Sequence, residues 1–87
     1  MHTRELRVPT VLLIDGYRFF FFSNENREPP HVHIEKGDSV AKWWLIPLRE
    51  EWTSGFSPAK RRRIHTIIVE NEATILEQWN EHFETGE

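Results

Sequence analysis

The chain has 87 residues, a formal net charge of −3, a hydrophobic fraction of 38% and a mean hydropathy of −0.61, values that suit one small domain with a thin core. It contains no cysteine, which excludes disulfides and thiolate metal sites, and its slight acidity argues against nucleic-acid binding driven by overall charge. No run approaches the roughly 20 apolar residues of a membrane span and the first ten residues lack a signal-peptide core, so we expect a cytoplasmic domain without a membrane partner.

The first predicted element is a β-hairpin, formed by two apolar runs on either side of Asp15-Gly16. A two-residue Asp-Gly loop favours this turn because both central positions need positive φ. The predicted cross-strand pairs are Ile14–Tyr17, Leu12–Phe19 and Thr10–Phe21. We expect residues 1–8 to form a flexible extension before the hairpin, and residues 9–47 to hold two hairpins in all.

Four consecutive phenylalanines, at positions 19–22, belong to the second strand of this hairpin. A strand alternates its side chains between two faces, so rings lie on both sides of the segment. We expect one side to be core. Phe20 and Phe22, on the other side, are candidate partner-interface residues because large exposed apolar patches are rare on monomers. The alternative is a second small core covered by a loop.

A second hairpin follows the polar loop at 23–30, with strands at 31–35 and 40–46 and a turn centred on Gly37-Asp38. Its predicted cross-strand pairs are His31–Trp44, Val32–Trp43, His33–Lys42 and Ile34–Ala41. The apolar pairs among them define the expected core face. Pro47 ends the last strand, and residues 48–56 are expected to be an irregular link.

The C-terminal part, residues 57–85, predicts a helical tail that begins at Ser57-Pro58, a typical N-cap followed by proline in the first turn. Its apolar residues recur at helical spacing at Ile64, Ile67, Ile68, Ile75, Trp79 and Phe83. Asn71 interrupts this stripe, which leaves either one continuous or gently kinked helix or two packed pieces.

These elements predict an α+β fold in which a four-stranded antiparallel sheet carries the helical segment on one face. One helix covers one face only. The opposite side of the phenylalanine run is therefore expected to meet a second copy of the chain, a different protein or a nucleic acid.

The string PTVLLIDGYRFFFFSNENREPPHVHIEKGDSVAKWWL, followed by GFS, closely resembles the bacterial family of uncharacterised domains known as DUF4160, from Pro9 to Phe83. The chain departs from the family pattern at Ile46, where an acidic residue is expected, and in the segment Arg49–Thr53. The resemblance implies a toxin–antitoxin-like gene pair with a DUF2442-type protein as the cognate partner. The family-motif residues carried over, without assigned roles, are Ser23, Asn24, Glu25, Arg27, Pro29, Pro30, His31 and His33.

The motif His31-Val32-His33 is the first candidate site, because two histidines at i, i+2 share one face of a strand. They are candidates for acid–base catalysis on an RNA 2′-hydroxyl, with Arg27 and Glu25 of the preceding loop completing the pocket. The alternatives are a metal site, for which no further ligand stands at a recognisable spacing, and simple packing against Trp44. We expect no cofactor and no metal.

A basic cluster at the start of the helical tail is the second candidate: residues 57–63 carry four basic and no acidic groups, whereas residues 64–87 carry six acidic and no basic groups. Positive charge in the first helical turns opposes the macrodipole, which favours a functional reading. The candidate phosphate contacts are Lys60, Arg61, Arg62, Arg63 and Lys42. The alternative is an ordinary solvated face.

Two functional hypotheses follow. In the first, the protein is one half of a toxin–antitoxin-like pair and acts on RNA as a metal-independent ribonuclease. In the second, it is a non-catalytic module that binds a cognate small protein, or a second copy of itself, through an aromatic sheet face. Trp44 joins the candidate interface, and Trp52 is a further candidate contact, whereas Trp43 and Trp79 are expected in the core.

Overall fold

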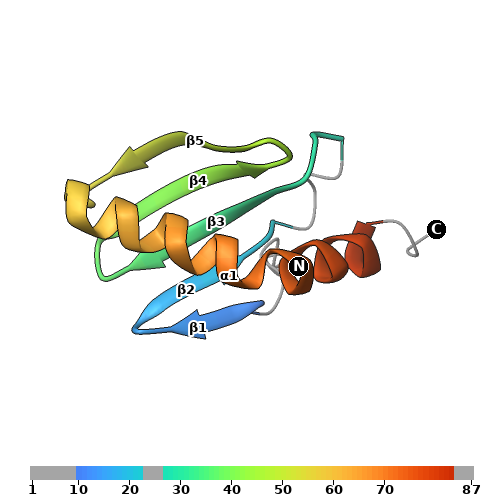
Figure 1. Ribbon diagram of the computed structural model, residues 1–87, viewed down its shortest axis with the longest axis horizontal. Helices are drawn as coiled ribbons and strands as arrows, with labels where there is room; N and C mark the ends of the chain where they lie inside the picture. The colour runs from blue at the N-terminus through green and yellow to red at the C-terminus, as the bar shows by residue number, and fades with distance from the viewer. Residues whose placement is uncertain (1–9, 23–26, 84–87) are drawn as a thin grey trace, which may run out of the picture.

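The computed structural model describes residues 10–22 and 27–83, which form an antiparallel sheet crossed on one face by a single long helix (Figure 1). The sheet has five strands in the order β1-β2-β3-β4-β5. Their bounds are Leu12–Ile14 for β1, Tyr17–Phe20 for β2, His31–Lys36 for β3, Ser39–Leu45 for β4 and Leu48–Ser54 for β5, and helix α1 spans Pro58–Phe83. The predicted α+β class is confirmed.

Both predicted hairpins are present with the expected registers, except that the predicted Thr10–Phe21 pair lies outside β1 and β2 and is not among their pairs. Asp15 and Gly16 have φ angles of 54° and 80°, the positive values that the two-residue turn requires. The cross-strand pairs include Leu12–Phe19 and Ile14–Tyr17 in the first hairpin, and His31–Trp44, Val32–Trp43, His33–Lys42 and Ile34–Ala41 in the second. The two hairpins join where β2 pairs with β3.

The prediction of four strands and an irregular link at 48–56 was wrong, because residues 48–54 form strand β5. This strand returns beside β4 after a turn that contains the cis peptide bond Ile46–Pro47. A bulge interrupts the pairing, so that Trp43 faces Glu50 while Lys42 faces Trp52. The extra residue breaks the period-two alternation by which a strand is recognised in sequence.

Helix α1 follows the predicted apolar stripe, and its first turn is capped by Ser57, whose Oγ accepts a hydrogen bond from the Lys60 amide at 3.2 Å. The helix runs through Asn71, which has non-helical dihedrals (φ −124°, ψ 18°) and marks a kink. The Asn71 side-chain amide donates to the Ile67 carbonyl oxygen at 2.8 Å. The helical tail therefore continues past Asn71, but it is kinked there and joins two helical segments.

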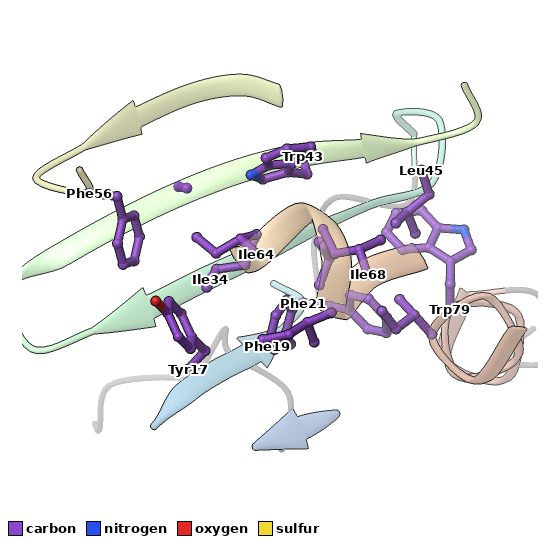
Figure 2. Close-up of a cluster of buried hydrophobic side chains, with 14 residues drawn as sticks. Tyr17, Phe19, Phe21, Ile34, Trp43, Leu45, Phe56, Ile64, Ile68 and Trp79 are labelled. Atoms are coloured by element: carbon purple, nitrogen blue, oxygen red, sulfur yellow. The ribbon is translucent and has the colours of Figure 1, made fainter. Parts of the chain in front are cut away.

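The core lies between α1 and the near face of the sheet (Figure 2). Phe19 and Phe21, which share one side of the phenylalanine run, are completely buried there, and the Phe21 ring meets Trp79 edge-on at 5.3 Å between centroids. The buried helix residues are Ile64, Ile67, Ile68, Ile75 and Trp79. Trp43 is also buried, so both tryptophans predicted to be core residues occupy it.

Candidate functional site

The face of the sheet that points away from α1, here called the outer face, is crossed by three rows of paired side chains. Strand alternation places these residues opposite the core residues of the same strands. The first row is Leu13, Arg18, Glu35, Val40 and Ser54; the second is Phe20, His33, Lys42 and Trp52; the third is His31, Trp44 and Arg49. The outer face is thus richer in aromatic rings than an ordinary solvated sheet surface.

Phe20, Phe22 and His33 form an aromatic stack on the outer face. His33 lies nearly parallel to Phe20 at 5.6 Å between centroids and edge-on to Phe22 at 4.6 Å. The Arg18 guanidinium covers Phe20 at 5.1 Å and is itself held by Glu35 at 2.6 Å. Phe20 is consequently only 3% exposed, whereas Phe22 is half-buried. Of the two phenylalanines predicted to contact a partner, only Phe22 offers surface.

A groove with a volume of about 310 Å³ runs along the outer face beside this stack. Its lining includes the aromatic stack on one side, Trp52 on the other and Val40 between them. Trp52 is 44% exposed, and Leu13, in the first row of the same face, is 67% exposed. The groove therefore combines an apolar hollow with a large unburied ring at its edge, the composition found in binding sites for apolar groups.

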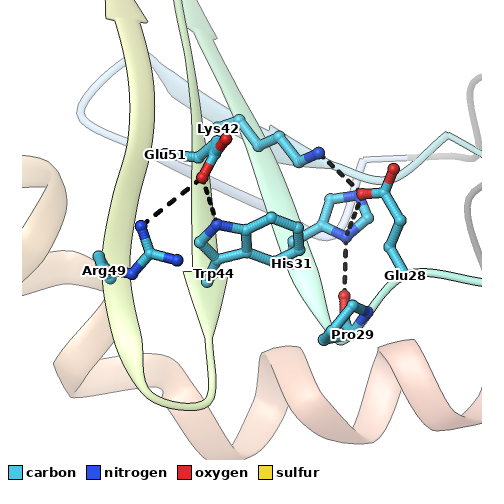
Figure 3. Close-up of polar contacts among 7 residues, drawn as sticks. All are labelled: Glu28, Pro29, His31, Lys42, Trp44, Arg49 and Glu51. Atoms are coloured by element: carbon cyan, nitrogen blue, oxygen red, sulfur yellow. Dashed lines mark hydrogen bonds and ion pairs between the residues drawn. The ribbon is translucent and has the colours of Figure 1, made fainter.

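At the end of the sheet, His31 is enclosed by a network of polar contacts (Figure 3). Its Nδ1 lies 2.9 Å from the Pro29 carbonyl oxygen, and because a carbonyl only accepts, this nitrogen carries the proton. Lys42 Nζ donates to Glu28 Oε1 at 2.8 Å, and the same oxygen lies 3.7 Å from His31 Nδ1. The side chain of His31 thus fixes the end of the loop that precedes β3.

Two tryptophan rings, one from β4 and one from α1, pack against the His31 ring. The His31 ring lies 5.5 Å from Trp44 and 5.1 Å from Trp79 of α1, and the residue is fully buried. Trp44 is fixed in turn, since its Nε1 donates to Glu51 at 2.5 Å and Lys42 Nζ lies over its ring at 4.6 Å. In this position the His31 side chain is packed within the fold and helps to hold the end of the sheet.

The residues predicted to surround an RNA backbone are not gathered at one place. Arg27 is exposed, whereas His33 is only 7% exposed within the aromatic stack. Glu25, Ser23 and Asn24 lie outside the described residues. The basic cluster, residues 60–63, lies in the first turns of α1, at the opposite end of the molecule from the start of β3 (Figure 1).

Two of the four cations in that cluster join α1 to the sheet. Arg61 forms a bidentate pair with Glu50 of β5, with its Nη2 at 2.7 Å from Oε1, and this hydrogen bond raises the pKa of Arg61. Arg63 pairs with Asp15 in the β1–β2 turn, and that hydrogen bond raises the pKa of Arg63. Both guanidinium groups therefore act as clamps between layers of the fold.

Potential metal ligands are dispersed in the part of the chain that the structure describes, where no three His, Asp or Glu side chains are grouped to hold an ion. His65 lies beside Trp43 at 5.7 Å, and His82 lies beside Phe21 at 6.1 Å, both far along the chain from the paired histidines of β3. Among the described residues, no helix has the length and apolarity needed to cross a bilayer.

Sequence reasoning missed two features of this region. Val40 was not recognised as a groove residue, because its role depends on the large rings that stand on the neighbouring strands. Glu28 was not singled out either, although its place directly before the two prolines of the PPHVH motif was a usable signal: the carboxylate holds Lys42 and lies close to His31.

Comparison with known proteins supplies the family. The family model described as a domain of unknown function, DUF4160, matches residues 16–80. Searches of the curated proteins and of the solved structures gave no match. The matched segment begins in the β1–β2 turn and ends near the C-terminus of α1, so it includes the outer face except Leu13, the PPHVH motif and nearly all of the core. The chain therefore belongs to the DUF4160 family.

Proposed function

We propose that this protein is a non-catalytic binding module that holds a cognate protein on the outer face of its sheet. The observation that carries the proposal is the groove beside the aromatic stack, with Trp52 exposed at its edge. Binding energy at protein interfaces concentrates in a few large aromatic side chains that enter or line a pocket. An exposed tryptophan beside an apolar hollow is such an arrangement.

The buried state of most of the stack supports a binding role. Phe20 and His33 are already packed within the single chain, so the groove wall exists before a partner arrives. A preformed wall avoids the cost of ordering these side chains on association. The flanking charges, Arg18 with Glu35 and Lys42 with Glu28, are paired at its margins and provide a polar rim.

The partner that we propose is the small DUF2442-type protein of a two-gene module resembling a toxin–antitoxin pair. This assignment rests on the family resemblance, and the groove supplies the surface that such a pairing needs. In this account the two histidines of β3 have structural roles: His33 is part of the groove wall and His31 holds the loop end.

A binding measurement with matched variants tests the proposal. The neighbouring gene product is titrated with the wild-type chain, with Trp52→Ala and with Val69→Ala, which removes apolar surface of similar exposure on α1, on the other side of the molecule. We expect Trp52→Ala to weaken binding at least about tenfold, as for a central aromatic contact, and Val69→Ala to leave the affinity per chain unchanged. Equal effects of the two variants, or no binding by the wild type, would contradict the proposal.

The RNA hypothesis gives a different result in cells. If the chain alone arrested growth, and His33→Ala relieved the arrest while Trp52→Ala did not, catalysis by the histidine would be supported against the binding module. For the binding module we expect no arrest from the chain alone.

A further inference from the structure

The solvent-facing side of α1 carries a self-complementary pattern of charge. The side opposite the buried stripe presents five exposed residues in successive turns: Arg62, Thr66, Val69, Ala73 and Glu77. The ends of this row, here called the α1 stripe, have opposite charge and its centre is small and apolar. Val69, at the centre, is 51% exposed, the most exposed large hydrophobic residue of the helix.

The spacing of the α1 stripe is nearly symmetric about Val69. Along the chain Arg62 lies seven residues before Val69 and Glu77 eight residues after it, with the kink at Asn71 on the Glu77 side. A two-fold axis through the centre of the stripe therefore places Arg62 of one chain opposite Glu77 of a second, antiparallel chain. The same rotation places Thr66 opposite Ala73, two small side chains that permit close approach.

We propose that two copies of this protein associate through the α1 stripe as an antiparallel, two-fold symmetric dimer. The occupant is a second copy because the stripe complements itself in charge, whereas a partner of uniform charge would be attracted to one half of the helix and repelled by the other. The proposal is independent of the partner on the outer face, since the stripe lies on the opposite layer.

The charges at the two ends are available for this contact. Within the described residues Arg62 and Lys60 form no ion pair, unlike Arg61 and Arg63, which are held by the sheet. Glu77 likewise has no ion pair among the described residues, and Glu70, the residue directly after Val69, adds further negative charge to the C-terminal half. The unpaired cation and the unpaired carboxylate are therefore those that the symmetric contact would join.

The dimer also accounts for basic residues at a helix start, where they oppose the macrodipole of their own helix. In an antiparallel pair the basic first turns lie beside the C-terminal half of the partner helix, where the partner's dipole is negative and its side chains are acidic. An arrangement that is unfavourable within one chain becomes favourable between two.

The association is expected to be weak and sensitive to salt. Threonine, valine and alanine at the centre bury little apolar area compared with the roughly 1,000 Å² or more of a stable interface. Exposed ion pairs contribute most of the attraction, and these are screened as ionic strength rises.

Sedimentation equilibrium of the full chain with charge-reversed variants tests the dimer. Arg62→Glu and Glu77→Arg are measured singly and together at about 20 mM and about 500 mM salt, ionic strengths at which screening differs strongly. At low salt we expect each single reversal to reduce the association constant about tenfold, since two contacts become repulsive in a symmetric dimer. The double reversal restores association to within about threefold, because the pairs reform with opposite polarity.

Controls separate this result from misfolding. Arg49→Glu reverses another exposed charge, on β5, and should leave association unchanged, and circular dichroism should be the same for every variant. A chain that stays monomeric at low salt up to millimolar concentration overturns the proposal. So does a double reversal that associates no better than either single variant.

Discussion

Among single residues, the four phenylalanines show how alternation divides one segment between two roles. Phe19 and Phe21 point into the core, whereas Phe20 is buried on the outer face by a histidine and an arginine. Phe21→Ala removes a ring packed against Trp79 and should lower the free energy of unfolding by about 3–5 kcal/mol. Leu13→Ala, at an exposed position, should change it by no more than about 0.5 kcal/mol. Urea titration of both variants measures the difference, and equal losses would contradict the assigned packing.

The two arginine clamps give a prediction about pH. Hydrogen bonds to Glu50 and Asp15 raise the pKa of Arg61 and Arg63, respectively. The two ion pairs therefore stabilise the fold fully at any pH below the pKa of arginine in the unfolded chain, and this stabilisation is lost only as pH rises through the higher pKa of the folded state. For arginine the folded-state pKa lies above the pH range in which protein stability is usually measured. Lysine has an ordinary pKa of about 10.4, so the Arg61→Lys, Arg63→Lys double variant should lose stability relative to wild type as pH rises above about 10. Thermal unfolding from pH 8 to 11 tests this, and parallel curves for both proteins would contradict it.

The histidine pair shows which part of the candidate site could be predicted from single residues. Its position on a strand face, opposite Lys42 and Trp44, follows from the hairpin register, and the structure has that register. The burial of His31 could not be predicted from the hairpin register, because it depends on packing against Trp79, which lies almost fifty residues later in α1. A periodic pattern can assign a residue to one face of a strand, but it does not show which residues of another element pack against that face.

Among the elements, the hairpins were predictable and strand β5 was not. Asp15 and Gly16 determine the first turn locally, because both adopt the positive φ that a two-residue turn requires. The cross-strand pairs of the hairpin are then found by counting outward from this turn along both strands. Strand β5 has the sequence LREEWTS, with three charged residues and a bulge that places Arg49 and Trp52 on one face. Its strand conformation comes from pairing with β4, which is a tertiary cause that local propensity does not show.

The link between β5 and α1 depends on Gly55, which has φ of +95°. A Cβ at this position would lie 2.5 Å from Ser39 Oγ and 3.2 Å from Ser39 Cα. Gly37, with φ of +61°, has nothing within 4 Å of the same position. Gly37→Ala should therefore cost about 1 kcal/mol for its left-handed backbone alone, and Gly55→Ala at least about 1 kcal/mol more because the β4 backbone must move. Chemical denaturation of the two variants compares them, and a smaller loss for Gly55→Ala would show that the link is not so constrained.

For the whole molecule, the helix and the sheet offer two separate surfaces. The outer face is proposed to hold the cognate protein, and the α1 stripe is proposed to join two chains. Because these surfaces lie on opposite layers, occupation of one leaves the other accessible (Figure 1). Together they predict an assembly with two copies of each protein.

Light scattering on the purified complex measures this composition. At low salt we expect a mass equal to two 10.5 kDa chains plus two partner chains, and with Arg62→Glu a mass equal to one of each. A one-to-one complex for the wild type would contradict the proposed dimer and would leave the proposed binding of a partner on the outer face unaffected. A two-to-two complex that Arg62→Glu does not dissociate would place the self-contact elsewhere.

The proposal that the outer face is a protein-binding surface is tested most directly by amide and indole NMR shifts of the labelled chain during titration with the neighbouring gene product. We expect the largest changes on the indole of Trp52 and on the amides of Phe22 and Val40, and little change in the amides around Val69 on α1. Formation of a complex whose shifts instead cluster on α1, with the Trp52 indole unmoved, would contradict it.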